Sequence, residues 1–242
     1  MLSKRISKLL LTGAVVGGMA GVANAGLNID VRATGVNGAP LGAGQTSKLI
    51  PVAAAGDVVS FDIFAVVTGT NATLTDDKIL SVSGSFRSTG ALLGTLAADY
   101  VRSVEEPPFS GYDAPGASVG LQQDLDGDGD LDVGSLNDGA AANFWAARFI
   151  LTSGQSAGVG INGRRIGFGT FTVGAGGGQT VVNFVGRSAA TAANYFQDNV
   201  TVAEASQDGA LGITILGGTL PDPATLSLAG LAGLALGRRR RA

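Results

Sequence analysis

The stretch DVVSFDIFAVV, residues 57–67, decides the fold class. Five apolar side chains recur in it with a period of two, namely Val59, Phe61, Ile63, Ala65 and Val67. A period of two places side chains on one face of a β-strand, whereas a helix needs a period near 3.6. The other face carries two polar and then two apolar residues, Ser60, Asp62, Phe64 and Val66. We therefore predict a strand that is buried on one face throughout and on both faces at one end.

The rest of the chain repeats this pattern in short pieces. Clusters of turn-forming residues separate further predicted strands at 27–33, 78–86, 144–152, 165–173, 180–187 and 211–216. GAGGGQ, residues 174–179, fits the loop of a hairpin. We predict an all-β chain, an antiparallel β-sandwich of jelly-roll or immunoglobulin- or cohesin-like type, with one domain over residues 26–220. The strand rhythm of AAAGDVVSFDIFAVV, IGFGTFTV and TVVNFV resembles that of cohesin-type and carbohydrate-binding-module sandwiches.

Two residue types are absent from all 242 positions. The chain has no cysteine, which excludes disulfides, thiolate zinc sites and thiol nucleophiles. It has no histidine, the commonest general base and transition-metal ligand. We therefore expect a protein that is not an enzyme.

The N-terminus has the three parts of a secretory signal peptide. Lys4, Arg5 and Lys8 form a basic start, an apolar run follows, and Ala23 and Ala25 frame an A-x-A cleavage motif. We predict that signal peptidase removes residues 1–25 and that the chain is exported. The alternative is a buried N-terminal helix.

The C-terminus, LPDPATLSLAGLAGLALGRRRRA, is also built as a processing segment. Asp222 can cap a helix and Pro223 suits its first turn. The uncharged run that follows would span about 22 Å as a helix, less than the roughly 30 Å of a bilayer core. A basic stop closes the chain with Arg238, Arg239, Arg240 and Arg241, which favour the cytoplasmic side of a membrane.

These residues carry a resemblance. Pro221, Asp222 and Pro223, the short predicted transmembrane helix and the arginine cluster resemble a PEP-CTERM sorting signal over residues 221–242. The resemblance implies transient anchoring in the inner membrane, processing by an exosortase-like membrane protease, and a host that makes exopolysaccharide. Asp222 stands where the family usually has glutamate, which keeps the carboxylate.

Two other interpretations of this tail remain open. The segment LPDPA partly resembles the sortase motif L-P-x-T-G, but Pro223 replaces the threonine at which sortases cut. An ordinary C-terminal membrane anchor is the other interpretation.

The body between the two ends is acidic. Seven of the 16 basic residues and one of the 19 acidic residues lie in the ends, which leaves nine basic and 18 acidic residues, a net charge of −9. Nucleic-acid phosphates demand the opposite sign, so we exclude a nucleic-acid partner. An acidic surface suits cation binding and extracellular solubility.

One stretch of the body has the pattern of a metal site. DLDGDGDLDVGS, residues 124–135, places aspartates at alternate positions with Gly129 at position 6 of a 12-residue calcium loop. The predicted ligands are Asp124, Asp126, Asp128, Asp130 (through its backbone carbonyl), Asp132 and Ser135. Calcium prefers six to eight hard oxygens, and a tight loop directs alternate side chains to one centre. We predict structural calcium binding; the alternative is a solvated acidic loop.

The loop resembles those of EF-hand, dockerin and thrombospondin-type proteins, with one departure. Ser135 stands at position 12, where these families place a bidentate acid. Asp138 or a water could substitute, and we expect an affinity of about 10⁻⁴ to 10⁻³ M, which is typical of extracellular modules.

Three other motif matches do not support catalysis. Residues 154–158 match G-x-S-x-G, but the chain has no histidine base and only Lys48 and Lys78 as lysines of the body. Residues 158–163 match G-x-G-x-x-G without a following helical pattern. Glu105 and Glu106 are adjacent, so on a strand they would point in opposite directions.

Together these features predict an exported, non-enzymatic protein of the cell surface or extracellular matrix. The alternative is a carbohydrate-binding or adhesion module of an exopolysaccharide matrix. That alternative needs exposed aromatic rings, and Trp145, the one tryptophan, lies in NFWAARFI, where core packing is expected.

Overall fold

The computed structural model describes residues 26–73, 76–101, 118–136, 143–148, 163–187, 192–204 and 209–218. Within these ranges the regular secondary structure consists of β-strands and no α-helix occurs, so the predicted all-β class is confirmed. No helix in this part of the chain is long and apolar enough to span a membrane. The predicted signal helix and the predicted C-terminal helix lie outside the described residues.

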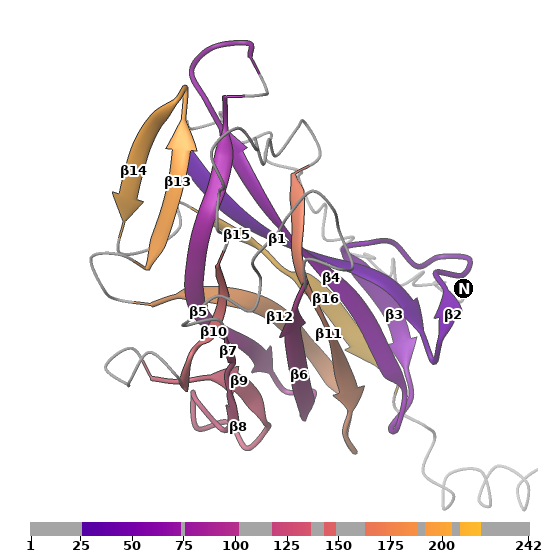
Figure 1. Ribbon diagram of the computed structural model, residues 1–242. Helices are drawn as coiled ribbons and strands as arrows, with labels where there is room; N and C mark the ends of the chain where they lie inside the picture. The colour runs from indigo at the N-terminus through magenta and orange to yellow at the C-terminus, as the bar shows by residue number, and fades with distance from the viewer. Residues whose placement is uncertain are drawn as a thin grey trace, which may run out of the picture.

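The described strands form two sheets (Figure 1). Sheet A has the order β15-β1-β4-β11-β6, with β2 beside β1. Its strands are β1 (Gly26–Val36), β2 (Ala39–Pro40), β4 (Val58–Thr68), β6 (Gly94–Tyr100), β11 (Arg164–Val173) and β15 (Gly209–Leu211).

Sheet B has the order β14-β13-β5-β12-β16-β3. Its long strands are β3 (Leu49–Ala53), β5 (Lys78–Gly90), β12 (Gly178–Gly186), β13 (Ala193–Gln197), β14 (Val200–Glu204) and β16 (Ile213–Gly217). A group of short strands joins it near β5, namely β7 (Ser118–Val119), β8 (Leu121–Gln123), β9 (Asp132–Gly134) and β10 (Trp145–Arg148). In Figure 1 these short strands lie at the lower end of the molecule, away from the turn of β13 and β14.

Strand β4 has the alternation expected from its sequence. Its five predicted inward residues are all buried, and the residues between them are partly exposed. The strand pairs with β1 on one side and β11 on the other, both antiparallel. The outer face is less deeply buried than predicted at both Phe64 and Val66, and the Phe64 ring is covered by the Arg32 guanidinium at 4.0 Å.

The core lies between the two sheets. Phe61 of sheet A and Phe86 of sheet B approach with ring centroids 6.4 Å apart. The Trp145 ring packs edge-on against Phe86 at 5.1 Å and is fully buried. A Cβ at Gly167 would lie 2.6 Å from this indole, so the absence of a side chain on β11 makes room for it. The two packed layers are consistent with the predicted β-sandwich.

Two expectations about topology are wrong. The sheets are not wholly antiparallel, because β1 pairs with β15, and β16 with β3, in parallel. Residues 174–179 do not close a hairpin: β11 belongs to sheet A and β12 to sheet B, so this segment crosses between the layers. Local turn chemistry cannot distinguish these two connections, because both need glycine at a tight reversal.

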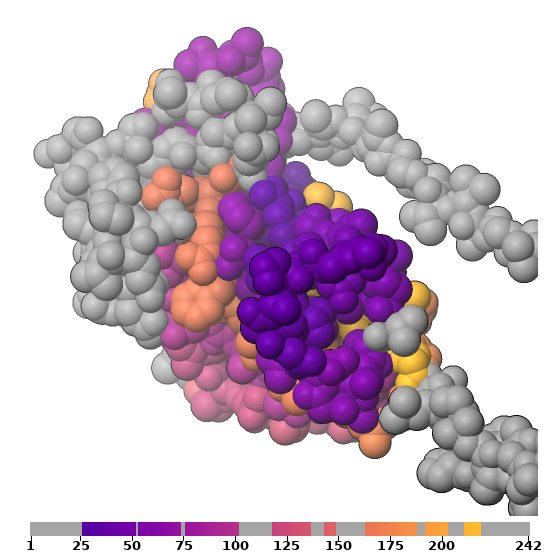
Figure 2. Space-filling model, turned by 90° about the vertical axis from the view of Figure 1, so that its right-hand side faces the viewer, coloured from indigo at the N-terminus to yellow at the C-terminus, as the bar shows by residue number. Residues whose placement is uncertain are grey.

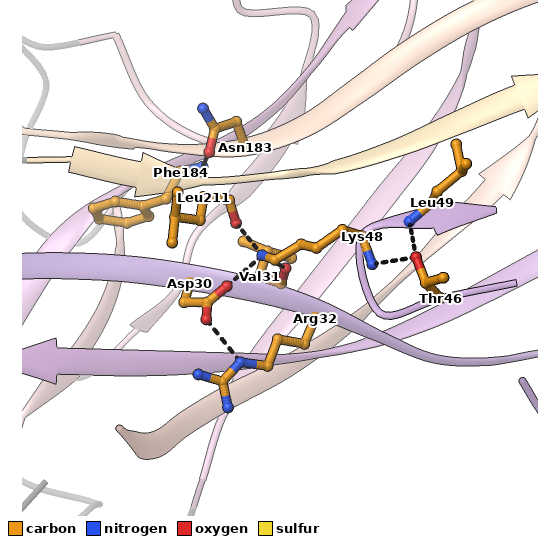
Figure 3. Close-up of polar contacts among 9 residues, drawn as sticks. All are labelled: Asp30, Val31, Arg32, Thr46, Lys48, Leu49, Asn183, Phe184 and Leu211. Atoms are coloured by element: carbon orange, nitrogen blue, oxygen red, sulfur yellow. Dashed lines mark hydrogen bonds and ion pairs between the residues drawn. The ribbon is translucent and has the colours of Figure 1, made fainter. Parts of the chain in front are cut away.

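A partly buried lysine ties the connection after β2 to sheet A (Figure 3). The Lys48 ammonium donates hydrogen bonds to the Asp30 carboxylate, to the Val31 carbonyl at 2.5 Å and to the Leu211 carbonyl at 2.8 Å. Asp30 also pairs with Arg32 at 2.7 Å. Burial lowers the pKa of Lys48, while the Asp30 carboxylate opposes that shift. The amine is thus fully engaged in joining β1 to β15.

Candidate metal centre

The predicted calcium loop connects β8 to β9 and turns sharply at its glycines. Gly127 and Gly129 have φ of 80° and 97°, a region that favours glycine. The Asp124 carboxylate accepts hydrogen bonds from the Gly127 N–H at 2.7 Å and the Gly129 N–H at 3.1 Å. The first aspartate therefore holds the turn that gathers the later ones.

The structure brings the five predicted aspartates together in two overlapping clusters. In each cluster, one carboxylate oxygen per residue lies within 4.8 Å of the others. The clusters are Asp124, Asp126 and Asp132, and Asp126, Asp128 and Asp130. Asp126 is shared, so these carboxylates form one continuous acidic centre that could hold a metal ion.

Strand β5 supplies the donors that position the deepest carboxylates. The Ser88 N–H donates to Asp132 at 2.8 Å, and its hydroxyl donates to Asp130 at 2.5 Å. The Leu125 N–H donates to the second Asp132 oxygen at 3.2 Å. Ser88, Asp130 and Asp132 are all buried.

The loop is also bonded to sheet A. Leu131 exchanges backbone hydrogen bonds with β6, donating to the Gly94 carbonyl at 3.0 Å and accepting from the Leu96 N–H at 2.7 Å. Two residues later, Val133 of β9 pairs with Phe86 of β5. The acidic loop therefore connects the edge strand β6 of sheet A to strand β5 of sheet B, and its conformation bears on how the two sheets are held together.

The electrostatics of the loop are unfavourable without a cation. Burial raises the pKa of Asp130 to about 7, the Ser88 hydroxyl opposes this, and the Asp132 and Asp128 charges add to it. Burial also raises the pKa of Asp132. Asp128 Oδ2 and Asp130 Oδ1 are buried without a hydrogen-bond partner. Within the described chain, none of the five aspartates is paired with a lysine or arginine.

The donor set fits a hard cation. It consists of carboxylate oxygens only, with no nitrogen or sulfur, which is the chemistry preferred by calcium and magnesium. Asp130 contributes its carboxylate to the cluster rather than only the backbone carbonyl that the loop pattern suggested. Ser135 follows β9 and is buried. Asp138 lies outside the described residues.

Ser88 is the residue that sequence reasoning missed. It sits two positions after Phe86 on the same face of β5, and both side chains are fully buried. A hydroxyl at a core-facing position needs a partner, and that is the signal by which the sequence could have pointed to it. Its partners lie more than 40 residues away along the chain, so local pattern does not identify them.

Several other predicted residues lie outside the described part of the chain. These are the cleavage motif with Ala23 and Ala25, the sorting motif with Pro221, Asp222 and Pro223, the four arginines at 238–241, Glu105, Glu106 and the glycine-rich motifs at 154–162. Lys48, one of the two lysines of the body, is bonded to three oxygens as described above. Trp145 is core, as expected.

No protein-family model, curated protein or solved structure matches this chain.

Proposed function

We propose that this is an exported, non-enzymatic protein of the cell surface or extracellular matrix whose fold is stabilised by calcium at residues 124–135. The observation that carries the calcium proposal is the pair of buried, unpartnered oxygens on Asp128 and Asp130. An ionised carboxylate oxygen without water, donor or cation is costly, and a divalent ion inside the cluster removes that cost.

Export and sorting are supported by the two ends of the chain. The basic, apolar and A-x-A parts at residues 1–25 support removal by signal peptidase. The tail with Asp222 supports processing by an exosortase-like protease after transient insertion in the membrane. Export also suits the calcium site, because millimolar calcium outside cells would occupy half or more of the copies of a loop with this affinity.

A processing experiment tests the sorting half of the proposal. In a bacterium with an active exosortase, we expect the mature protein to lose its tail, and Asp222→Glu to be processed as well as the natural chain. Asp222→Ala should accumulate uncut, since it loses the carboxylate. Uncut natural protein in that strain would contradict exosortase sorting.

Polysaccharide binding is the alternative function, and the sequence offers few aromatic rings for it. Trp145 is buried between the sheets and presents no face to a sugar. A glycan-array screen with and without calcium tests this alternative. Calcium-dependent binding would support it, and no binding in either condition would remove it.

A further inference from the structure

Three aspartates outside the 124–135 loop meet at the other end of the molecule. Asp76 and Asp77 directly precede β5, and Asp198 lies in the turn between β13 and β14. One carboxylate oxygen of each lies within 4.8 Å of the other two. Figure 1 shows the β13–β14 turn at the upper end and β8 and β9 at the lower end, and in Figure 2, from a second side, the pink segment that carries the 124–135 loop again lies at the lower end. This cluster is therefore distinct from the calcium loop.

Backbone geometry fixes the position of Asp198. Asp198 and Asn199 have φ of 51° and 63°, as in the two-residue type I′ turn that closes a hairpin. The Asp198 N–H donates to Asp77 Oδ1 at 3.1 Å, and the Asn199 N–H donates to the Asp76 carbonyl at 3.2 Å. The β13–β14 turn is thus bonded to the two aspartates that directly precede β5.

The β4–β5 connection closes on the same carboxylates. The Gly69 N–H donates to Asp77 at 3.0 Å, and the Thr70 N–H and hydroxyl donate to Asp198 at 2.9 and 2.5 Å. A Cβ at Gly69 would lie 2.3 Å from an Asp198 oxygen and 2.7 Å from an Asp77 oxygen. Only a glycine allows both carboxylates to approach the backbone so closely, so their convergence is built into the connection.

One oxygen of this cluster has no partner. Asp76 is 8% exposed, and its Oδ2 accepts a hydrogen bond from the Asn71 amide at 3.0 Å. Its Oδ1 is buried and makes no hydrogen bond. An ionised carboxyl group in this state normally finds a donor, a water or a metal. Asp76 Oδ1 therefore lacks the partner that a cation bound at this cluster would supply.

No basic side chain compensates the cluster within the described residues. Lys78 is the nearest basic residue in sequence. Its ammonium donates to the Asn199 side chain at 3.5 Å and lies 5.6 Å over the Phe196 ring. Three carboxylates are thus held together by backbone donors while their charges repel one another.

We propose that Asp76, Asp77 and Asp198 form a second divalent-cation site, which binds calcium through the free Asp76 Oδ1 and one oxygen of each neighbour. Calcium accepts irregular sets of oxygen ligands completed by water, whereas magnesium demands a near-ideal octahedron. The ion would clamp the β4–β5 connection to the β13–β14 hairpin. This site goes beyond the proposed function, because it shares no residue with the 124–135 loop.

Calcium titration by calorimetry tests the proposal on the full-length chain. The double variant Asp126→Asn/Asp128→Asn first removes two carboxylates from the loop. We expect the natural chain to bind two calcium ions and this variant to retain one. Adding Asp198→Asn should remove the remaining ion, and adding Asp76→Asn, which alters the other side of the site, should do the same.

Asp57→Asn in the double-variant background is the matched control. Asp57 also holds a turn, accepting hydrogen bonds from the Ala54 N–H and the Asn37 amide. It belongs neither to the 124–135 loop nor to the second proposed site. We expect this variant to retain one ion. Circular dichroism checks that each variant is folded.

Three results would overturn the second site. In the first, the loop variant binds no calcium. In the second, the natural chain binds a single ion and the loop variant loses it. In the third, the Asp76→Asn and Asp198→Asn variants are folded and still bind the remaining ion. The natural chain and the loop variant alone decide the matter if the other variants do not fold. A single ion that is lost on Asp198→Asn and kept in the loop variant would support this site and contradict calcium at 124–135.

Discussion

Ser88 shows at the scale of one residue how the fold and the acidic loop depend on each other. Its N–H and hydroxyl are the donors that β5 offers to Asp132 and Asp130. Both carboxylates are nearly inaccessible to solvent, so they rely on these bonds for stabilisation. A buried polar group without a partner costs more than an average hydrogen bond contributes.

Ser88→Ala should destabilise the protein. The substitution removes the hydroxyl donor to Asp130 and leaves a buried carboxylate oxygen with one bond fewer. We expect a loss of about 1–3 kcal/mol in the free energy of unfolding, measured by urea denaturation. Ser118→Ala is the control, because its hydroxyl bonds the Gly120 N–H at a half-exposed position. Equal stability of the Ser88→Ala and natural proteins would contradict this role.

The raised pKa of Asp130 predicts how stability depends on pH in the absence of metal. The unfolded chain loses this proton near the ordinary value of about 4, whereas the folded chain holds it to about 7. The folded state therefore binds more protons between these values, and stability falls as pH rises through that window, by up to about 1.4 kcal/mol per pH unit.

Denaturation in EDTA at pH 4 to 7 measures this dependence. With saturating calcium we expect the fall to be smaller or reversed, since the ion binds the deprotonated form. Stability in EDTA that rises steadily over the same range would contradict the assignment of a raised pKa to Asp130.

At the scale of one element, strand β9 lies close to β5 because Gly134 has no side chain. Gly134 has a φ of 132°, and a Cβ there would lie 2.5 Å from the Ser85 Cβ on β5. The close approach lets β9 pair with β5 and so places the end of the acidic loop over Ser88.

Gly134→Ala should therefore cost more than its backbone conformation alone. Gly176 is the matched control, because its φ of 133° is nearly the same and nothing lies within 4 Å of its added Cβ. We expect Gly134→Ala to be less stable than Gly176→Ala by about 1–3 kcal/mol, the usual cost of overpacking. Thermal denaturation measures both, and equal losses would mean that β9 can shift away from β5 freely.

At the scale of the whole molecule, strand β5 links the acidic loop at residues 124–135 to the cluster of Asp76, Asp77 and Asp198. Asp77 directly precedes its first residue and Ser88 lies near its end. Thirteen residues of extended chain span about 40 Å, so the clusters are separated by most of the length of a sheet. Cations at both positions would fasten loops at opposite ends of the same strand.

The sequence could predict features that neighbouring residues determine, but not those that depend on contacts between distant segments. Residues 57–67 gave the correct strand and face because a half-buried strand carries its own period. Strand β6, GTLAADY, was missed, because its burial does not alternate and pairing with β11 decides its conformation. The loop aspartates could be found because they are neighbours in sequence. Asp77 and Asp198 could not, because only folding brings residues 121 apart into contact.

The most direct test of calcium stabilisation is a thermal melt of the purified protein in 10 mM calcium and again in EDTA, with Asp128→Ala measured beside it. An affinity near 10⁻⁴ M would stabilise the folded state by about 2.7 kcal/mol at this concentration. For a domain of this size that corresponds to a rise in Tm of roughly 5–10 °C. We predict that rise for the natural protein and a smaller one for Asp128→Ala. Identical curves in calcium and EDTA would contradict calcium stabilisation and leave residues 124–135 as an acidic loop without a structural cation.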